Sequence, residues 1–87
     1  MAKKLFVGNL DWGLTEEELR ELFSEFGEIE EVIIITDRAS GRSKGFGFVT
    51  FVDDKSADDA IAKLDGQDLK DRKIVVNEAR PPKENRY

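Results

Sequence analysis

Residues 44–51 alternate between two kinds of side chain, and this period of two constrains the fold more than any other feature of the sequence. One set comprises Lys44, Phe46, Phe48 and Thr50, and the other comprises Gly45, Gly47, Val49 and Phe51. Successive side chains of a β-strand point to opposite faces of the sheet. The second set is typical of a face under helices, where glycines permit close approach of backbone. The stretch therefore predicts a strand whose Phe46 and Phe48 point towards water.

The rest of the chain divides into further strand and helix patterns. Apolar and β-branched runs predict strands at residues 5–7, 32–36 and 73–77, beside the one at residues 45–51. Apolar residues at helical spacing predict a first helix between Thr15 and Gly27. Thr15 opens it with a T-x-x-E capping box. A second helix is predicted to begin at Asp53 or Asp54 and to close at Gly66.

The order of these elements predicts the fold class. Strand, helix, strand, strand, helix, strand is the order of the α+β, ferredoxin-like βαββαβ sandwich, which has two helices on one face of a four-stranded antiparallel sheet. A chain of 87 residues fits one such unit and is too short for two independent cores. We expect a domain over residues 1–80 and a C-terminal tail over residues 81–87.

A third phenylalanine is expected on the open face of this sheet. Leu5 and Val7 suit the core, which places Phe6 on the face of Phe46 and Phe48 if the strands that carry them lie centrally. Exposed aromatic residues lower solubility, and stacking with nucleobases is one reason to keep them. The alternative is that all three are ordinary core aromatics, and spacing alone leaves that alternative open.

Composition narrows the classes of function. The chain contains no cysteine and no histidine, which excludes disulfides, zinc knuckles and histidine-based catalytic triads. We therefore expect a non-enzymatic protein without cofactor or metal. The apolar run after residues 1–4 is far too short for a signal peptide or a membrane span, so a soluble, cytoplasmic monomer is expected.

Two motifs resemble those of the RNA-recognition-motif family. Residues 44–51, KGFGFVTF, match every fixed position of the family's octamer. Residues 5–10, LFVGNL, are similar to the companion hexamer, and the likeness extends from about residue 4 to residue 80. The start at Met1 without a targeting segment resembles small single-domain bacterial members of the family.

The resemblance implies binding of single-stranded RNA on the sheet. It implies that Phe6 and Phe48 stack on neighbouring bases, that Phe46 packs against the sugars, and that Lys44 pairs with a phosphate. It implies that Phe51 is buried. Base edges would be read at the end of the last strand, by Asn77, Glu78, Ala79 and Arg80. The basic loop before residue 44 would add positive charge through Arg38 and Arg42. Single-stranded DNA offers the same base faces, so some DNA binding is expected.

The net charge of −5 opposes a nucleic-acid partner unless the charges are segregated. Most acidic residues fall in the two predicted helices. The basic residues fall instead on segments expected to border the open face, and they include Lys3, Lys4, Arg38, Arg42, Lys44, Lys73 and Arg80. The alternative function is a protein-interaction module of the same fold that uses its acidic helices or the apolar strip around Ile33 and Ile35.

Trp12 follows the first predicted strand. Since most tryptophans bury much of their surface, it is expected to pack near the start of the first helix, with base stacking as the alternative.

Overall fold

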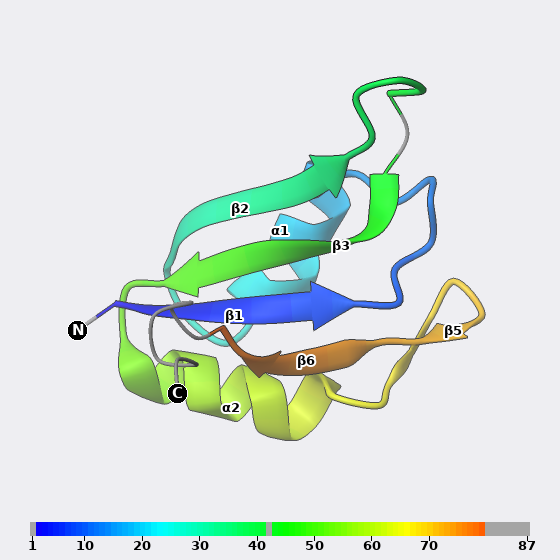
Figure 1. Ribbon diagram of the computed structural model, residues 1–87. Coiled ribbons are helices and arrows are strands. Elements are labelled where there is room, and N and C mark those ends of the chain that lie inside the picture. The colour runs from blue at the N-terminus through cyan, green and yellow to red at the C-terminus, as the bar shows by residue number, and fades with distance from the viewer. Residues whose placement is uncertain (1, 42, 80–87) are drawn as a thin grey trace, which may run out of the picture.

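The computed structural model describes residues 2–41 and 43–79, without the side chains of Ser43 and Lys44. Figure 1 shows its elements, which follow the expected order with one addition. The helices and strands are β1 (Lys3–Gly8), α1 (Glu16–Ser24), β2 (Ile29–Thr36), β3 (Ser43–Phe51), α2 (Asp54–Leu64), β4 (Asp68–Leu69), β5 (Arg72–Lys73) and β6 (Val75–Glu78).

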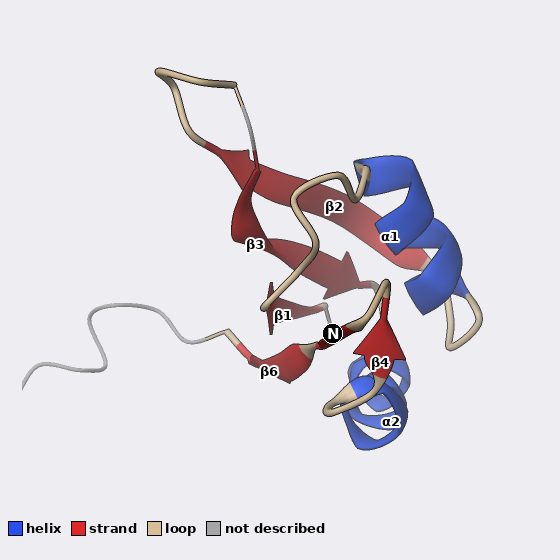
Figure 2. Cartoon of the chain, turned by 90° about the vertical axis from the view of Figure 1, so that its right-hand side faces the viewer, coloured by secondary structure: helices blue, strands red, loops and turns tan. Residues whose placement is uncertain are grey.

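The main sheet has four antiparallel strands in the order β2-β3-β1-β6. Both helices lie on one face of this sheet, and the opposite face carries no helix (Figure 2). The ferredoxin-like α+β class predicted from the sequence is confirmed. Strands β3 and β1, which carry the three phenylalanines in question, occupy the centre of the sheet.

The last segment differs from the prediction. The strand expected at residues 73–77 begins only at Val75, and a small hairpin of β4 and β5 precedes it. Ile74 is buried, and its backbone exchanges hydrogen bonds with Gly66 and Gln67 instead of with β1. The chain therefore closes the end of α2 before it joins the main sheet.

The core lies between the helices and the inner face of the sheet. Phe23 from α1 and Phe51 from β3 are fully buried, with ring centroids 6.2 Å apart. Gly47 permits the close approach predicted for it, because a Cβ at this position would collide with the carbonyl oxygen of Ile33. The other core residues include Leu5, Val7, Leu19, Val49, Ala57, Ala60 and Val76.

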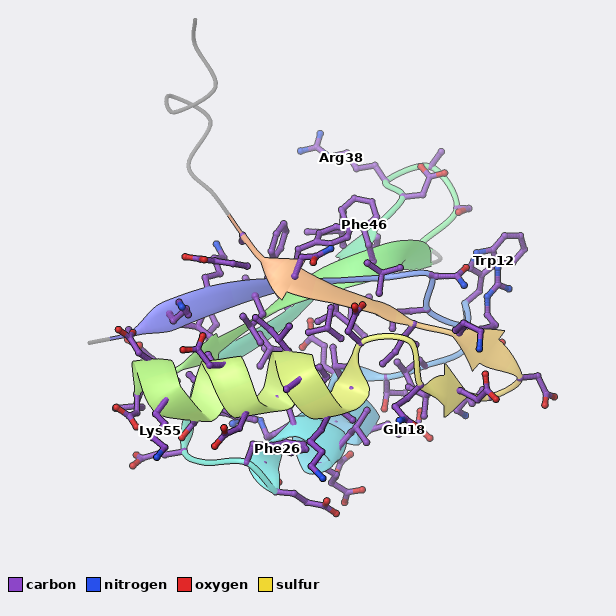
Figure 3. All side chains as sticks on the ribbon, turned by 90° about the horizontal axis from the view of Figure 1, so that it is seen from below. Trp12, Glu18, Phe26, Arg38, Phe46 and Lys55 are labelled. Atoms are coloured by element: carbon purple, nitrogen blue, oxygen red, sulfur yellow. The ribbon has the colours of Figure 1, made fainter. Side chains whose placement is uncertain are left out.

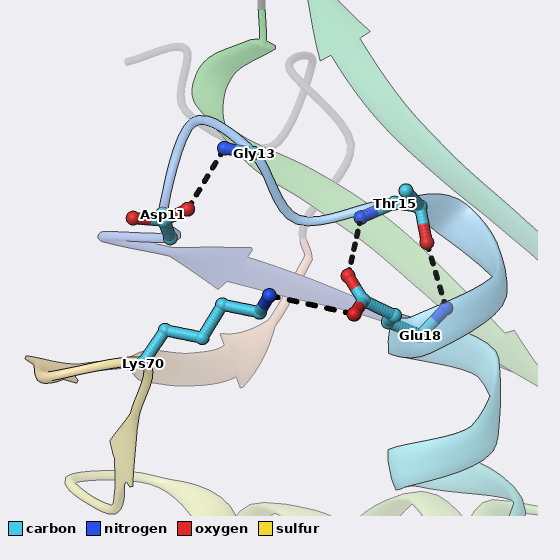
Figure 4. A network of polar contacts seen from close by, with 5 residues as sticks. All are labelled: Asp11, Gly13, Thr15, Glu18 and Lys70. Carbon is cyan, nitrogen blue, oxygen red and sulfur yellow. Dashed lines mark hydrogen bonds and ion pairs between the residues drawn. The ribbon is translucent and has the colours of Figure 1, made fainter.

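Helix α1 begins with the predicted capping box (Figure 4). The Glu18 amide donates to Thr15 Oγ1 at 3.1 Å, and the Thr15 amide donates to Glu18 Oε1 at 3.0 Å. The Thr15 backbone hydrogen bond, helped by the Lys70 ammonium 3.4 Å away, holds the pKa of the Glu18 carboxyl below its usual 4.5. A lowered pKa means that ionised Glu18 stabilises the fold above pH 4.5. This contribution disappears as the pH falls through the folded-state value.

We expect Thr15→Ala to lower the free energy of unfolding by about 1 kcal/mol, because it removes the acceptor for one unpaired amide of the first helical turn. Urea unfolding followed by circular dichroism would measure the loss. Thr15→Ser retains the hydroxyl and is the matched control. Equal destabilisation by both variants would contradict this role of the hydroxyl.

Candidate nucleic-acid interface

A row of four side chains crosses the helix-free face of the sheet. Strand register pairs Phe6 with Phe48 on one side and with Asn77 on the other, and it pairs Phe48 with Ile33. Directly paired residues of antiparallel strands project to the same face. The neighbouring Leu5, Val7 and Val49 are buried on the opposite face. The alternation in the sequence thus separates an outer aromatic row from the core.

Phe6, Phe46 and Phe48 form one cluster on this face, which we call the aromatic platform. The ring of Phe6 lies 5.8 Å from that of Phe46 and 6.0 Å from that of Phe48, and the rings of Phe46 and Phe48 are 6.5 Å apart. All three are partly exposed, and none belongs to the buried core. The alternative that they are ordinary core aromatics is wrong. Figure 3 shows Phe46 on the side of the sheet away from Phe26 and Lys55, which lie on the helix side.

Gly8 leaves room for the ring of Phe6. A Cβ at Gly8 would lie 2.8 Å from Phe6 Cε2, closer than carbon atoms approach without a shift. The ring therefore leans over the end of β1, towards the loop that contains Trp12. A side chain at position 8 would push the ring away and alter the platform.

Lys4 supplies a positive charge at the platform. Its ammonium lies 4.9 Å from the centroid of the Phe48 ring, within the range of a cation–π contact. The sequence places Lys4 only in a general basic group, and its contact with an aromatic ring depends on strand register. Arg38 is exposed in the loop between β2 and β3, on the platform side (Figure 3). Arg42, Arg80 and the side chain of Lys44 lie outside the described residues.

The sequence predicts that Lys3 borders the open face, but it lies on the helix side. Its ammonium donates to Asp58 of α2 at 2.9 Å, and this hydrogen bond is the largest cause that raises the pKa of Lys3. The Lys73 ammonium also has an acidic partner, the Asp68 carboxylate at 3.8 Å. Since neighbouring residues of a strand point to opposite faces, Lys3 and Lys4 separate although they are adjacent in sequence.

The end of β6 divides between the two faces. Asn77 is exposed opposite Phe6, and so it joins the platform face. Glu78 follows the alternation of buried Val76 to the helix side, where its carboxylate lies 4.0 Å from the Lys3 ammonium. The Ala79 amide donates to the carbonyl oxygen of Lys4 at 2.9 Å. Of the described residues predicted to read bases, Asn77 lies directly opposite Phe6, whereas the side chain of Glu78 lies on the helix side.

Trp12 is not packed against the first helix, and this expectation is wrong. Its side chain is 61% exposed, while Leu10 and Leu14 on either side of it are buried. Together with Phe6 and Phe46 it lines a hollow of about 320 Å³ at the end of β1. Arg72, from the unpredicted β4–β5 hairpin, lines the same hollow. Sequence patterns gave no indication of a cation at this place.

The described residues contain neither a metal-binding cluster nor a membrane-spanning helix. Within residues 2–41 and 43–79, no group of three or more acidic side chains is arranged to hold a metal ion. No helix of the described chain has the length and apolar character required to cross a bilayer.

Solved structures of RNA-binding proteins resemble the chain. The crystal structure of RNA Binding Protein PG1 has 42% identity and a TM-score of 0.87, covering 91% of this chain and 98% of the other. The Rna15 RRM with bound RNA (GU) has 28% identity and a TM-score of 0.82, covering 90% and 83%.

Sequence relatives include proteins from plants and a fungus, so the expected likeness to bacterial members is not supported. Glycine-rich RNA-binding protein 4, mitochondrial, from Arabidopsis thaliana is 49% identical over 77 residues, 88% of this chain and 57% of its own. GRP2A from Sinapis alba is 55% identical over 76 residues, 87% of this chain and 45% of its own. Glycine-rich RNA-binding protein 1 from Mycosarcoma maydis is 49% identical over 79 residues, 91% and 45%.

The chain thus spans about half the length of the curated relatives it matches. The model of the RNA recognition motif matches residues 5–75, which include the whole aromatic platform. The chain belongs to the RNA recognition motif family.

Proposed function

We propose that this domain binds single-stranded RNA across the open face of its sheet, with bases stacked on Phe6 and Phe48 and with Phe46 against the sugars between them. The observation that carries the proposal is the aromatic platform itself: three partly exposed rings within 6.5 Å of one another, outside the core. Stacking on aromatic side chains is how RNA-binding modules of this kind hold unpaired bases. The RNA-binding names of its relatives and structural neighbours support the same ligand.

Polar groups around the platform would position the strand. The Asn77 side chain adjoins Phe6 and can donate to and accept from a base edge. Arg38 is exposed in a loop that borders the same face, where it would meet the phosphate backbone. Lys44, Arg42 and Arg80 stay predictions for phosphate or base contacts, as do backbone groups at Glu78 and Ala79.

We further propose that the domain is a binding module without catalytic activity and that it acts as a monomer in the cytoplasm. Some of its relatives are named as mitochondrial, so imaging of the tagged protein in cells is the test of this localisation. Binding of single-stranded DNA is expected too, since DNA bases have the same stacking faces. The division into a domain of residues 1–80 and a tail of residues 81–87 also stays a prediction, because residues 80–87 are not described.

The protein-interaction alternative is less well supported. It would use the acidic helices or the apolar strip around Ile33 and Ile35, and neither of these explains why three aromatic rings are exposed on the open face. Retention of all three platform rings and the RNA-binding relatives favour RNA.

Fluorescence anisotropy of a labelled single-stranded RNA of random sequence, titrated at low and moderate salt, tests the proposal. We expect saturable binding that weakens as salt is raised, because phosphate contacts release counterions. An RNA duplex of the same length should compete poorly, since its bases are not available for stacking. Absence of binding at low salt would overturn the proposal.

We expect Lys4→Gln to weaken RNA binding several-fold. A base that stacks on Phe48 would displace the Lys4 ammonium from the ring, and the nearest favourable site for this charge is a phosphate. The slope of log affinity against log salt should fall in magnitude by about 0.7, the effect of one lost contact to a single strand. Lys55→Gln on the helix side changes the net charge equally and is the matched control (Figure 3). Equal effects of both variants would show that only net charge matters.

A further inference from the structure

The hollow at the end of β1 continues the aromatic platform beyond its third ring. Phe6 and Phe46 belong both to the platform and to the wall of this hollow, and Trp12 forms another wall. Its volume of about 320 Å³ lies at the lower end of the range for sites that hold small organic groups, roughly 300–1,000 Å³. The platform and the hollow are therefore one continuous surface.

The loop that carries Trp12 is fastened to β3 by one backbone hydrogen bond and is held in shape by another hydrogen bond within the loop. The Leu10 amide donates to the carbonyl oxygen of Gly45 at 2.8 Å, which fastens the loop to β3. The Asp11 carboxylate accepts from the Gly13 amide at 2.8 Å just after Trp12 (Figure 4). Trp12 nevertheless remains 61% exposed between these anchors. A fastened loop with an exposed indole is a preformed surface for an aromatic ligand.

Gly45 brings β3 close to the indole. A Cβ at Gly45 would lie 3.8 Å from Trp12 Nε1, so the backbone of β3 lies beside the ring. Gly45 has φ +89°, a conformation that side chains rarely adopt. This glycine thus lets β3 start next to Trp12 without filling the hollow.

We propose that the hollow binds one further nucleobase of the same RNA strand, stacked on Trp12, with Arg72 contacting the adjoining phosphate. The inference rests on the proposed function, because the strand reaches the hollow by continuing past Phe46. Tryptophan provides a large face for stacking, and a guanidinium suits a phosphate. The combination of an exposed indole, shared platform rings and a cation fits a nucleotide.

The emission of Trp12 reports directly on this site, because it is the only tryptophan in the chain. We expect its fluorescence to change on titration with an unlabelled six-nucleotide single-stranded RNA. The change should saturate at the RNA concentration at which anisotropy of the labelled strand saturates. Wild-type binding to RNA with unchanged Trp12 emission at saturation would overturn the inference.

Substitutions give the second readout. Trp12→Ala should weaken binding about tenfold, the effect of one lost stacked base, and Trp12→Phe should retain most of the affinity. Arg72→Ala should weaken binding more than Arg20→Ala, which removes an equal charge from the exposed side of α1. Circular dichroism of each variant verifies folding, which an exposed side chain should not affect.

The two proposals fail in distinguishable ways. If Phe6→Ala/Phe48→Ala abolishes binding while Trp12→Ala binds like the wild type, the platform is the RNA site and the hollow is not part of it. If the wild type binds no RNA, or if the double variant binds RNA equally well, the proposed function fails and the inference fails with it.

Discussion

Replacement of both Phe6 and Phe48 by alanine should weaken binding of single-stranded RNA at least about tenfold, while the domain stays folded. Each stacked base contributes roughly 1–3 kcal/mol, and about 1.4 kcal/mol corresponds to a factor of ten. The two losses need not add, because the rings lie 6.0 Å apart in one cluster. Anisotropy titrations of the wild type and the double variant at the same salt measure the effect.

Two controls make this result specific. Phe6→Leu/Phe48→Leu keeps apolar surface on the face but removes the rings, and it should lose affinity as the alanine variant does. Val52→Ala shortens another exposed apolar residue at the end of β3 and should bind normally. An undiminished affinity of the double alanine variant would exclude the platform as the RNA site.

Phe51→Ala should lower the free energy of unfolding by about 3–5 kcal/mol, the usual loss when a fully buried phenylalanine is truncated. Phe51 packs against Phe23. Its truncation to alanine leaves a cavity that α1 and β3 cannot close without shifting. Domains of this size have a total stability on the order of 5–15 kcal/mol, so a large part would be lost. Urea unfolding would measure this loss, provided that the slope of the free energy of unfolding against urea concentration is the same in the variant and the wild type.

Phe48→Ala is the informative comparison, because Phe48 lies three residues earlier in the same strand and faces the opposite way. It should lower stability much less than Phe51→Ala, and it should lower RNA affinity much more. Phe51→Leu, which is milder, should stay folded and bind RNA normally. Equal destabilisation at positions 48 and 51 would mean that both rings belong to the core.

The sequence predicts the periodic parts of the molecule well. The alternation in residues 44–51 correctly separates buried Val49 and Phe51 from partly exposed Phe46 and Phe48. The box of Thr15 and Glu18 locates the start of α1, because a cap depends on side chains only three residues apart. These features need no knowledge of the tertiary fold.

Features that depend on tertiary contacts or on unusual turns are missed. The hairpin of β4 and β5 has strands of two residues, too short for a periodic signal. Its turn places Lys70 and Asp71 at positive φ. Such turns usually contain a glycine, which would have indicated the turn in the sequence. As a result, Arg72 and its place beside Trp12 cannot be predicted from the sequence.

The side chains of single charged residues are the least predictable part of the interface. A shift of one position moves a strand residue to the other face, so Lys3 meets Asp58 while its neighbour Lys4 meets Phe48. Exposure of Trp12 is equally invisible to pattern analysis, because the burial of Leu10 and Leu14 leaves open which way the residue between them points.

The acidic layer on α1 and α2 should govern how fast RNA arrives more than how tightly it is held. The domain measures 22 Å along its shortest axis, whereas the Debye length is about 30 Å at 0.01 M salt and about 10 Å at 0.1 M. In dilute buffer an approaching polyanion is therefore repelled by carboxylates on the far side of the sheet. At ionic strengths near 0.1 M this repulsion is screened across the thickness of the domain. The association rate constant should thus rise with salt over this range, opposite to the behaviour of strongly basic RNA-binding proteins. The affinity should still fall, because salt weakens the phosphate contacts and so raises the dissociation rate constant more steeply.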